Sequence, residues 1–244
     1  MRKLILYLTF NYPSPDTFTR FLDEVSRLPV DYVELGLPTQ NPVYDGPAIR
    51  QTHSGTRRPS AEEMSRAVKK LHGAGIRTYF LQYFRDIEGQ RDTFLTTVNA
   101  SGADGILLPD LLIDFFQGAE GHIHAVHSHG LDFVPFFNPA MPDRTISRFS
   151  SITRSWAYCG LIPSTGINVP YDQGAVVERM LSLLRGREVN FGFGLRSLED
   201  VRKLVSGRDV GVAIGTALIP YVREGDLEGF RKFVTELRGV LCDS

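Results

Sequence analysis

Strand-like and helix-like segments alternate along all 244 residues, and this rhythm constrains the fold more than any single motif. Short apolar runs of strand character are each followed by apolar residues at helical spacing, which is typical of βα units in a parallel sheet. Eight such units in about 240 residues match the usual size of a (β/α)8 barrel. We therefore predict a TIM barrel that forms a single domain over residues 1–244, with a doubly wound open sheet as the alternative. The predicted strands are 4–9, 30–34, 76–81, 106–108, 133–137, 156–159, 188–191 and 210–214, and the clearest helices are 88–100, 114–129 and 227–241.

The charges nearly cancel, because 27 Lys and Arg residues stand against 28 Asp and Glu residues. A chain of this balance has no overall field that would recruit nucleic acid or an acidic membrane, so we expect neither as a partner.

Cys159 and Cys242 lie far apart and lack metal-ligand spacing, which suits a reduced protein. No apolar run approaches the roughly 18 residues that a membrane span needs. We expect a soluble, cytoplasmic protein.

The segment around Glu34 and Asp45 concentrates the features of a reactive site. Glu34 ends a predicted apolar strand, and Asp45 follows in a loop rich in Gly and Pro. A carboxylate at the end of an apolar strand is partly desolvated, which raises its pKa and suits it to proton transfer. In a barrel the active-site face is built from the carboxyl ends of the strands. We therefore predict that both acids face one substrate; a solvated strand-end acid and a plain turn residue are the alternatives.

The same rule applied to the other strands selects further polar residues at or just after the predicted strand ends. These candidates are Tyr7, Tyr83, Asp110, Tyr158 and Thr165.

Two glycine loops follow the last two predicted strands, at 192–194 and 215–216. In TIM barrels the loops after strands seven and eight, together with the N-terminus of a short extra helix, commonly bind phosphate through backbone N–H groups. Glycine allows the backbone to approach an anion closely. We predict a phosphate site in these loops, with plain turn chemistry as the alternative.

Four histidines, His122, His124, His127 and His129, lie close together in the sequence. Only some of them share a helix face, and the predicted helix lies on the outside of the barrel, far from the active face. We interpret them as a solvated helix end and predict no metal site. Because no Ser-His-Asp or Cys-His arrangement is visible either, acid–base chemistry on a phosphorylated small molecule is the remaining prediction.

The letters ELGLP at 34–38, followed by NPVYDGP at 41–47, resemble the hallmark segment of the tryptophan synthase alpha subunit family. The resemblance continues at 106–110, 164–166, 192–194 and 214–216, and so covers nearly the whole barrel. It implies cleavage of indole-3-glycerol phosphate to indole and glyceraldehyde 3-phosphate, a retro-aldol reaction in which carbon 3 of the indole ring must be protonated.

The resemblance also implies a role for each matching residue. Glu34 would move protons to and from the substrate, and Asp45 would accept or polarise the indole N–H. The indole pocket would be lined by Tyr7, Leu107 and Phe193, with Tyr83 and Tyr158 near the reacting centre and Thr165 on a loop that closes over the substrate. The phosphate would be held by Gly166, Gly194, Gly215 and Thr216. The chain would need no cofactor of its own, and pyridoxal phosphate is expected on a beta-subunit partner.

The chain departs from the bacterial pattern of this family in several places. Met1 leads directly into the first strand, and the loop at 160–166 keeps only the final Thr-Gly. Residues 39–41 and Arg85 differ on loops through which the family docks on its beta subunit. Three readings therefore stay open: an alpha subunit with a beta partner, a stand-alone lyase that releases indole, and a non-catalytic regulatory subunit. A sugar-phosphate isomerase or aldolase on the same fold is the further alternative, although a Schiff-base aldolase would need a Lys that no predicted strand end offers.

Overall fold

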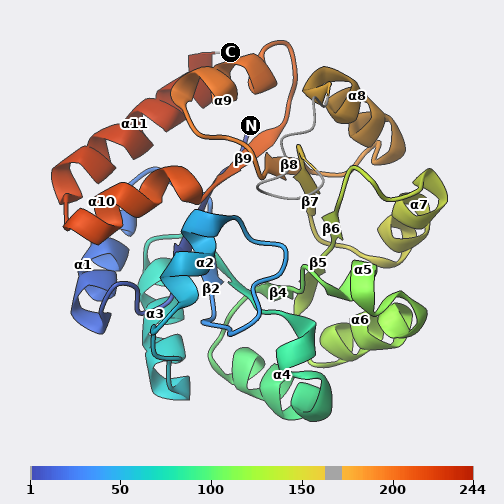
Figure 1. The fold of residues 1–244 in the computed structure, drawn as a ribbon, viewed down its shortest axis with the longest axis horizontal. Coiled ribbons are helices and arrows are strands. Elements are labelled where there is room, and N and C mark those ends of the chain that lie inside the picture. The colour runs from blue at the N-terminus through green and yellow to red at the C-terminus, as the bar shows by residue number, and fades with distance from the viewer. Residues whose placement is uncertain (1, 163–171, 244) are drawn as a thin grey trace.

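In the described part of the chain, nine parallel strands form one sheet that curves into a nearly closed barrel, with helices around its outside (Figure 1). The computed structural model describes residues 2–162 and 172–243. The neighbouring strands follow the order β5-β4-β3-β2-β1-β9-β8-β7-β6. The TIM-barrel prediction is confirmed. The strands are β1 (Leu4–Thr9), β2 (Tyr32–Gly36), β3 (Arg77–Leu81), β4 (Gly105–Leu107), β5 (Asp132–Val134), β6 (Phe136–Phe137), β7 (Ala157–Gly160), β8 (Val189–Gly192) and β9 (Gly211–Ile214).

The helices begin where the sequence offers capping residues. Ser14, Ser60 and Ser197 each accept a hydrogen bond from a backbone N–H of the first turn of the following helix. The α-helices are α1 (Pro15–Val25), α2 (Pro47–His53), α3 (Ala61–Gly73), α4 (Arg91–Ala100), α5 (Leu111–Asp114), α6 (Ala119–Ser128), α7 (Asp143–Ile152), α8 (Gln173–Leu183), α9 (Leu198–Val205), α10 (Ile219–Glu224) and α11 (Leu227–Asp243). Short 3-10 helices are η1 (Phe84–Asp86), η2 (Glu88–Gln90), η3 (Phe116–Gly118) and η4 (Thr216–Leu218). Within the described residues, no helix is long and apolar enough to cross a membrane.

Alternation along the strands separates two apolar cores. In β1, Leu4, Leu6 and Leu8 belong to the layer between barrel and helices, whereas Ile5 and Tyr7 belong to the cluster inside the barrel. Both faces of the strand are therefore buried, which explains its continuous apolar run. The parallel register pairs Tyr7 with Glu34, so the carboxylate of Glu34 shares the inner face.

The predicted position of Glu34 at a strand end is wrong by two residues. Strand β2 runs Tyr32–Gly36 rather than 30–34, so Glu34 lies in the middle of the strand. Its pairing with both β1 and β3 continues to Gly36. The consequence strengthens the acid–base prediction, because a mid-strand side chain on the inner face is more deeply buried than one at the strand end.

The predicted fifth strand, 133–137, is two strands. Pro135 lacks an N–H and cannot continue the ladder on both sides. The segment before it, β5, pairs with β4, and the segment after it, β6, pairs with β7. The Pro135 carbonyl still accepts from the Tyr158 N–H at 3.0 Å. The sheet thus begins and ends in consecutive pieces of chain, and the peptide through Pro135 joins its two edges.

Several predicted helices have different bounds. The predicted helix 114–129 is interrupted by η3, and helix α6 begins only at Ala119. The predicted helix 88–100 starts as the 3-10 turn η2 and becomes α-helical at Arg91. Helices α2 and α10, which follow β2 and β9, were not predicted, because each is a single short segment without a long apolar stripe.

Candidate active site

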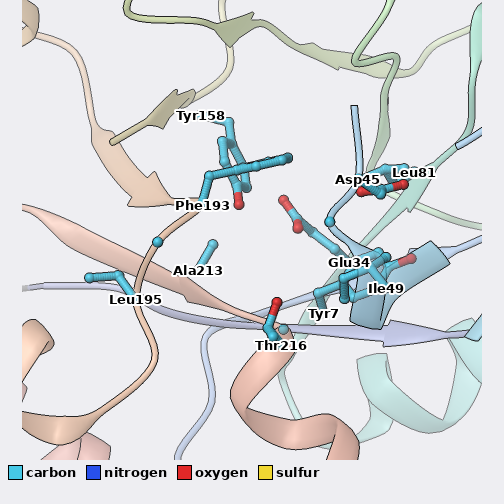
Figure 2. A pocket seen from close by; sticks show the side chains of 13 residues that line it. Tyr7, Glu34, Asp45, Ile49, Leu81, Tyr158, Phe193, Leu195, Ala213 and Thr216 are labelled. Atoms are coloured by element: carbon cyan, nitrogen blue, oxygen red, sulfur yellow. The ribbon is translucent and has the colours of Figure 1, made fainter. Parts of the chain in front are cut away.

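A pocket opens at the carboxyl ends of the strands (Figure 2). In Figure 2 the carboxylate of Glu34 points into its centre, with Tyr158 and Phe193 on one side and Asp45 and Ile49 on the other. The lining residues are Tyr7, Glu34, Asp45, Gly46, Ile49, Leu81, Tyr158, Phe193, Gly194, Leu195, Ala213, Gly215 and Thr216. Acidic, aromatic and glycine-rich walls therefore meet around one cavity.

Most of the site residues predicted from the sequence lie in this pocket. The lining contains Glu34, Asp45, Tyr7, Tyr158, Phe193, Gly194, Gly215 and Thr216. Leu107 is buried in the cluster inside the barrel that also contains Tyr7 and Tyr158, beneath the pocket. Tyr83 lies behind Asp45 instead of on the pocket wall. The predicted residues Thr165 and Gly166 lie outside the described residues.

Glu34 is a buried acid with few compensating contacts. The residue is 1% exposed, and its Oε1 has no hydrogen-bond partner among the described residues. Burial raises the pKa of the Glu34 carboxyl to about 8, and repulsion from Asp45 acts in the same direction. A carboxyl of this kind holds its proton at neutral pH and can release it to a substrate, as a general acid must.

Asp45 is held in place by its neighbours, although it belongs to a loop. The Tyr83 hydroxyl donates to its Oδ2 at 3.0 Å and accepts from the Tyr44 N–H at 3.0 Å. Arg50 of α2 donates to the carbonyls of Asp45, at 2.6 Å, and Val43, at 2.8 Å. Asp45 is 6% exposed. The loop therefore presents a fixed carboxylate opposite Glu34.

Two tyrosines, Tyr7 and Tyr158, line the pocket, and two strand-end glycines make room for them. A Cβ on Gly36 would lie 2.2 Å from the Tyr7 hydroxyl, and one on Gly192 would lie 1.9 Å from the Tyr158 hydroxyl. Burial raises the pKa of both hydroxyls well above the usual range, and the charge of the two acids adds to this effect. Both tyrosines therefore stay neutral and shape an aromatic slot.

The remaining wall comes from the loops after β8 and β9. Phe193 and Gly194 both have positive φ angles, 55° and 116°. The 3-10 helix η4 begins at Thr216 directly after Gly215 and leads into α10. A short extra helix after the last strand is the feature that accompanies phosphate sites in this fold.

Asp110 and His122, which the sequence also singled out, have structural contacts outside the pocket. Asp110 accepts from the N–H groups of Phe84, at 2.7 Å, and Arg85, at 3.0 Å, and so fixes the chain after β3. On α6, His122 bonds Arg91 at 2.9 Å and packs on Phe84. Among the described residues no group of three His, Cys, Asp or Glu side chains could hold a metal ion.

His53, the last residue of α2, lies beside the pocket acids and was not among the predicted site residues. Its ring lies 3.3 Å from the Tyr7 hydroxyl and 3.6 Å from Asp45 Oδ2. Helix α2 had a usable signal, since Gly46 precedes it and Pro47 occupies its first turn. With that helix recognised, Ile49 and His53 would fall on one face at a spacing of four.

Comparisons with known proteins agree with this geometry. The model of the family described as tryptophan synthase alpha chain matches residues 1–240. The tryptophan synthase alpha chain of Sulfurisphaera tokodaii is 33% identical over 240 residues, which are 98% of each chain. That of Saccharolobus solfataricus is 30% identical over 98% of this chain and 97% of its own. A solved mutant tryptophan synthase alpha-subunit from Pyrococcus furiosus is 26% identical, with a TM-score of 0.83 and coverage of 97% and 98%.

Proposed function

The chain belongs to the tryptophan synthase alpha chain family, the lyases that cleave indole-3-glycerol phosphate in tryptophan biosynthesis, and we propose that the pocket around Glu34 and Asp45 carries out this cleavage. One observation carries the proposal. A buried carboxyl that is protonated at neutral pH faces a second carboxylate in an aromatic slot. The reaction needs two acids of different basicity in this arrangement.

Glu34 and Asp45 together can carry out all the proton transfers of the cleavage. Protonated Glu34 gives its proton to carbon 3 of the indole ring, and Asp45 accepts a hydrogen bond from the indole N–H and stabilises the positive charge of the ring. The resulting Glu34 carboxylate then takes the proton of the side-chain hydroxyl. The carbon–carbon bond breaks, its electron pair neutralises the ring, and the hydroxyl carbon becomes the aldehyde of glyceraldehyde 3-phosphate. Glu34 ends protonated, as it began.

The other pocket residues bind the two ends of the substrate in this proposal. Tyr7, Tyr158 and Phe193 hold the indole ring, and Leu107 supports them from within the barrel. Gly194, Gly215 and Thr216 of the same pocket lining offer the phosphate site. Tyr83 acts through Asp45. The roles of Thr165 and Gly166 rest on the sequence resemblance.

We also propose that the chain works as the alpha subunit of a complex with a beta subunit that carries pyridoxal phosphate. Proton transfers alone balance the cleavage, so the proposal needs no cofactor in this chain. The loops that carry residues 39–41 and Arg85 are the expected docking region, and nearby Val43 is one of three large hydrophobic side chains that are exposed among the described residues. The free thiols of Cys159 and Cys242 suit a cytoplasmic location.

The decisive experiment is an assay of indole release from indole-3-glycerol phosphate by the purified chain, with and without a beta subunit. We expect slow release by the chain alone and faster turnover in the complex. Equal turnover in both conditions would favour a stand-alone lyase. No turnover in either condition would contradict the proposed function.

A further inference from the structure

We infer that His53 is a positioning residue that fixes the carboxylate of Asp45 for the reaction, an inference that rests on the proposed function. No functional role falls to this histidine in the sequence resemblance. Its side chain is 1% exposed and lies between the loop at 38–41 and the pocket acids. A buried imidazole needs partners for both ring nitrogens, so its contacts reveal what it does.

A backbone N–H group determines which ring nitrogen of His53 carries the proton. The Thr39 N–H points to Nδ1 of His53 at 3.4 Å, so Nδ1 is the acceptor and does not carry the proton. In the neutral ring the proton is then on Nε2. Nε2 faces the Tyr7 hydroxyl at 3.3 Å and Asp45 Oδ2 at 3.6 Å. The ring therefore gives its single N–H to the Tyr7 hydroxyl and packs this N–H group within 3.6 Å of the catalytic aspartate.

Both neighbours of the Asp45 side chain approach the same oxygen. Tyr83 donates to Oδ2 at 3.0 Å, while Nε2 of His53 bonds the Tyr7 hydroxyl at 3.3 Å and lies 3.6 Å from the same carboxylate oxygen. Among the described residues nothing bonds Oδ1. The Tyr83 hydrogen bond and the packed imidazole ring together restrict the rotation of the carboxylate and leave the other oxygen for the substrate. Since a misplacement of about 1 Å can cost about 100-fold in rate, such a contact matters without touching the substrate.

His53 also links the catalytic acid to the surface. Residues 39–41 and His53 together line a groove on the outer side of the loop. Thr39 selects the tautomer through its backbone N–H, so a shift of this loop changes the group that faces Asp45. The position of the loop and the orientation of the catalytic carboxylate are thus joined through one imidazole.

The test compares His53→Phe, which keeps the ring shape without its nitrogens, with His53→Gln, which restores an N–H donor. For His53→Phe we expect kcat for indole release to fall about 10- to 100-fold with KM changed less than about threefold, and for His53→Gln a partial recovery. In an Asp45→Asn background, His53→Phe should cost little more. The matched control is His122→Gln, which removes a bonded ring outside the pocket and should keep full kcat.

An unchanged kcat in folded His53→Phe, an equal loss in both His53 variants, or a full additional loss in the Asp45→Asn background would overturn the inference. A second measurement needs no activity. With 15N-labelled histidine, the Nε2 of His53 should carry the proton, and its resonance should move in Asp45→Asn; a proton on Nδ1 would overturn the inference. If the wild type releases no indole, the proposed function fails, and the nitrogen spectrum then tests only whether His53 contacts the Asp45 carboxylate.

Discussion

The partly buried Asp104 before β4 and the fully buried Glu34 in the pocket show how the same chemical group can serve stability or reactivity. Asp104, just before β4, accepts hydrogen bonds from the Thr78 N–H at 2.7 Å and from Arg77 at 2.9 Å, and His72 lies at 2.8 Å. Burial alone would raise its pKa, but these donors outweigh burial and lower it. Among the described residues no donor bonds Oε1 of Glu34, and the pKa of this carboxyl is raised to about 8.

The pKa values of the two acids differ because the acids have different numbers of hydrogen-bond donors around them. At the amino end of the strands, a backbone N–H group and cationic side chains surround Asp104, so its charged form is stable and joins β3 and α3 to the start of β4. At the carboxyl end, the acid faces aromatic rings and another acid, so its charged form is disfavoured. An unsatisfied group costs stability, and this cost is the expected signature of a reactive site.

The largest expected effect is on catalysis by Glu34. Glu34→Gln removes the transferable proton, and we expect indole release to fall by about 10⁴-fold with the fold intact. Steady-state assays with indole-3-glycerol phosphate measure the loss of indole release, and circular dichroism measures whether the fold is intact. The matched control is Glu24→Gln, which removes a buried acid that is paired with Arg231 at 2.6 Å and should keep its activity. Near wild-type turnover in Glu34→Gln would refute the proposed role.

The second effect is a pH dependence of stability. The raised pKa means that folded Glu34 holds a proton between about pH 4.5 and 8 that the unfolded chain releases, so the wild type loses stability as the pH rises through this window. Glu34→Gln should lack this loss and should be more stable than the wild type by about 3–5 kcal/mol at pH 8. Urea unfolding at pH 5 and pH 8 measures the difference. Parallel pH profiles for the two proteins would contradict it.

Asp45→Asn should reduce kcat for indole release by about 100-fold, because the amide carries no charge to stabilise the protonated ring. It also removes the repulsion that raises the pKa of Glu34, so that pKa should fall. Kinetics and the pH profile of kcat/KM test both expectations. Asp31→Asn, at the amino end of the barrel, is the control: it loses bonds to the Leu4 N–H and Arg238 and should affect stability only. Unaltered kcat in Asp45→Asn would argue against its role.

The smallest effect should come from Asp104→Asn. The amide keeps the shape but loses the charge-assisted bonds to Arg77 and His72, and we expect a loss of about 1–3 kcal/mol in the free energy of unfolding with unchanged indole release. Because the pKa of Asp104 is lowered, the wild-type advantage should be present above about pH 4 and should disappear as the pH falls through the folded pKa. If Asp104→Asn lost as much activity as Asp45→Asn, the proposed division between a stabilising acid and a reactive acid would be wrong.

The barrel could be predicted from the sequence because every strand is a compact apolar run between turn signals. Strand β1 was predicted at its observed bounds. The split at Pro135 was not, although the missing N–H was visible in the sequence; strand propensity on both sides concealed it. Short helices such as α2 carry too few residues for a periodic pattern. The assignment of residues 1–244 to a single domain stays a prediction.

The site was predictable only in part, for a physical reason. The placement rule for barrel enzymes selects Glu34 and Tyr158 from their positions along strands, and the structure brings them to one pocket. That Glu34 faces inward depends on strand register, which the sequence leaves undefined by one or two residues. His53 acts through distances to groups 14 and 46 positions away, and such distances exist only after folding.

The break between β5 and β6 at Pro135 limits where the chain can be cleaved or can accept an insertion. Strand β5 pairs with β4 and β6 with β7, and the peptide through Pro135 joins these two outer members of the sheet order. A nick or a long insert there would create two free strand edges, whose unpaired backbone groups invite association with other chains. Circular permutation at this position would therefore favour aggregation, whereas new termini in a surface loop would leave the ring of strands complete.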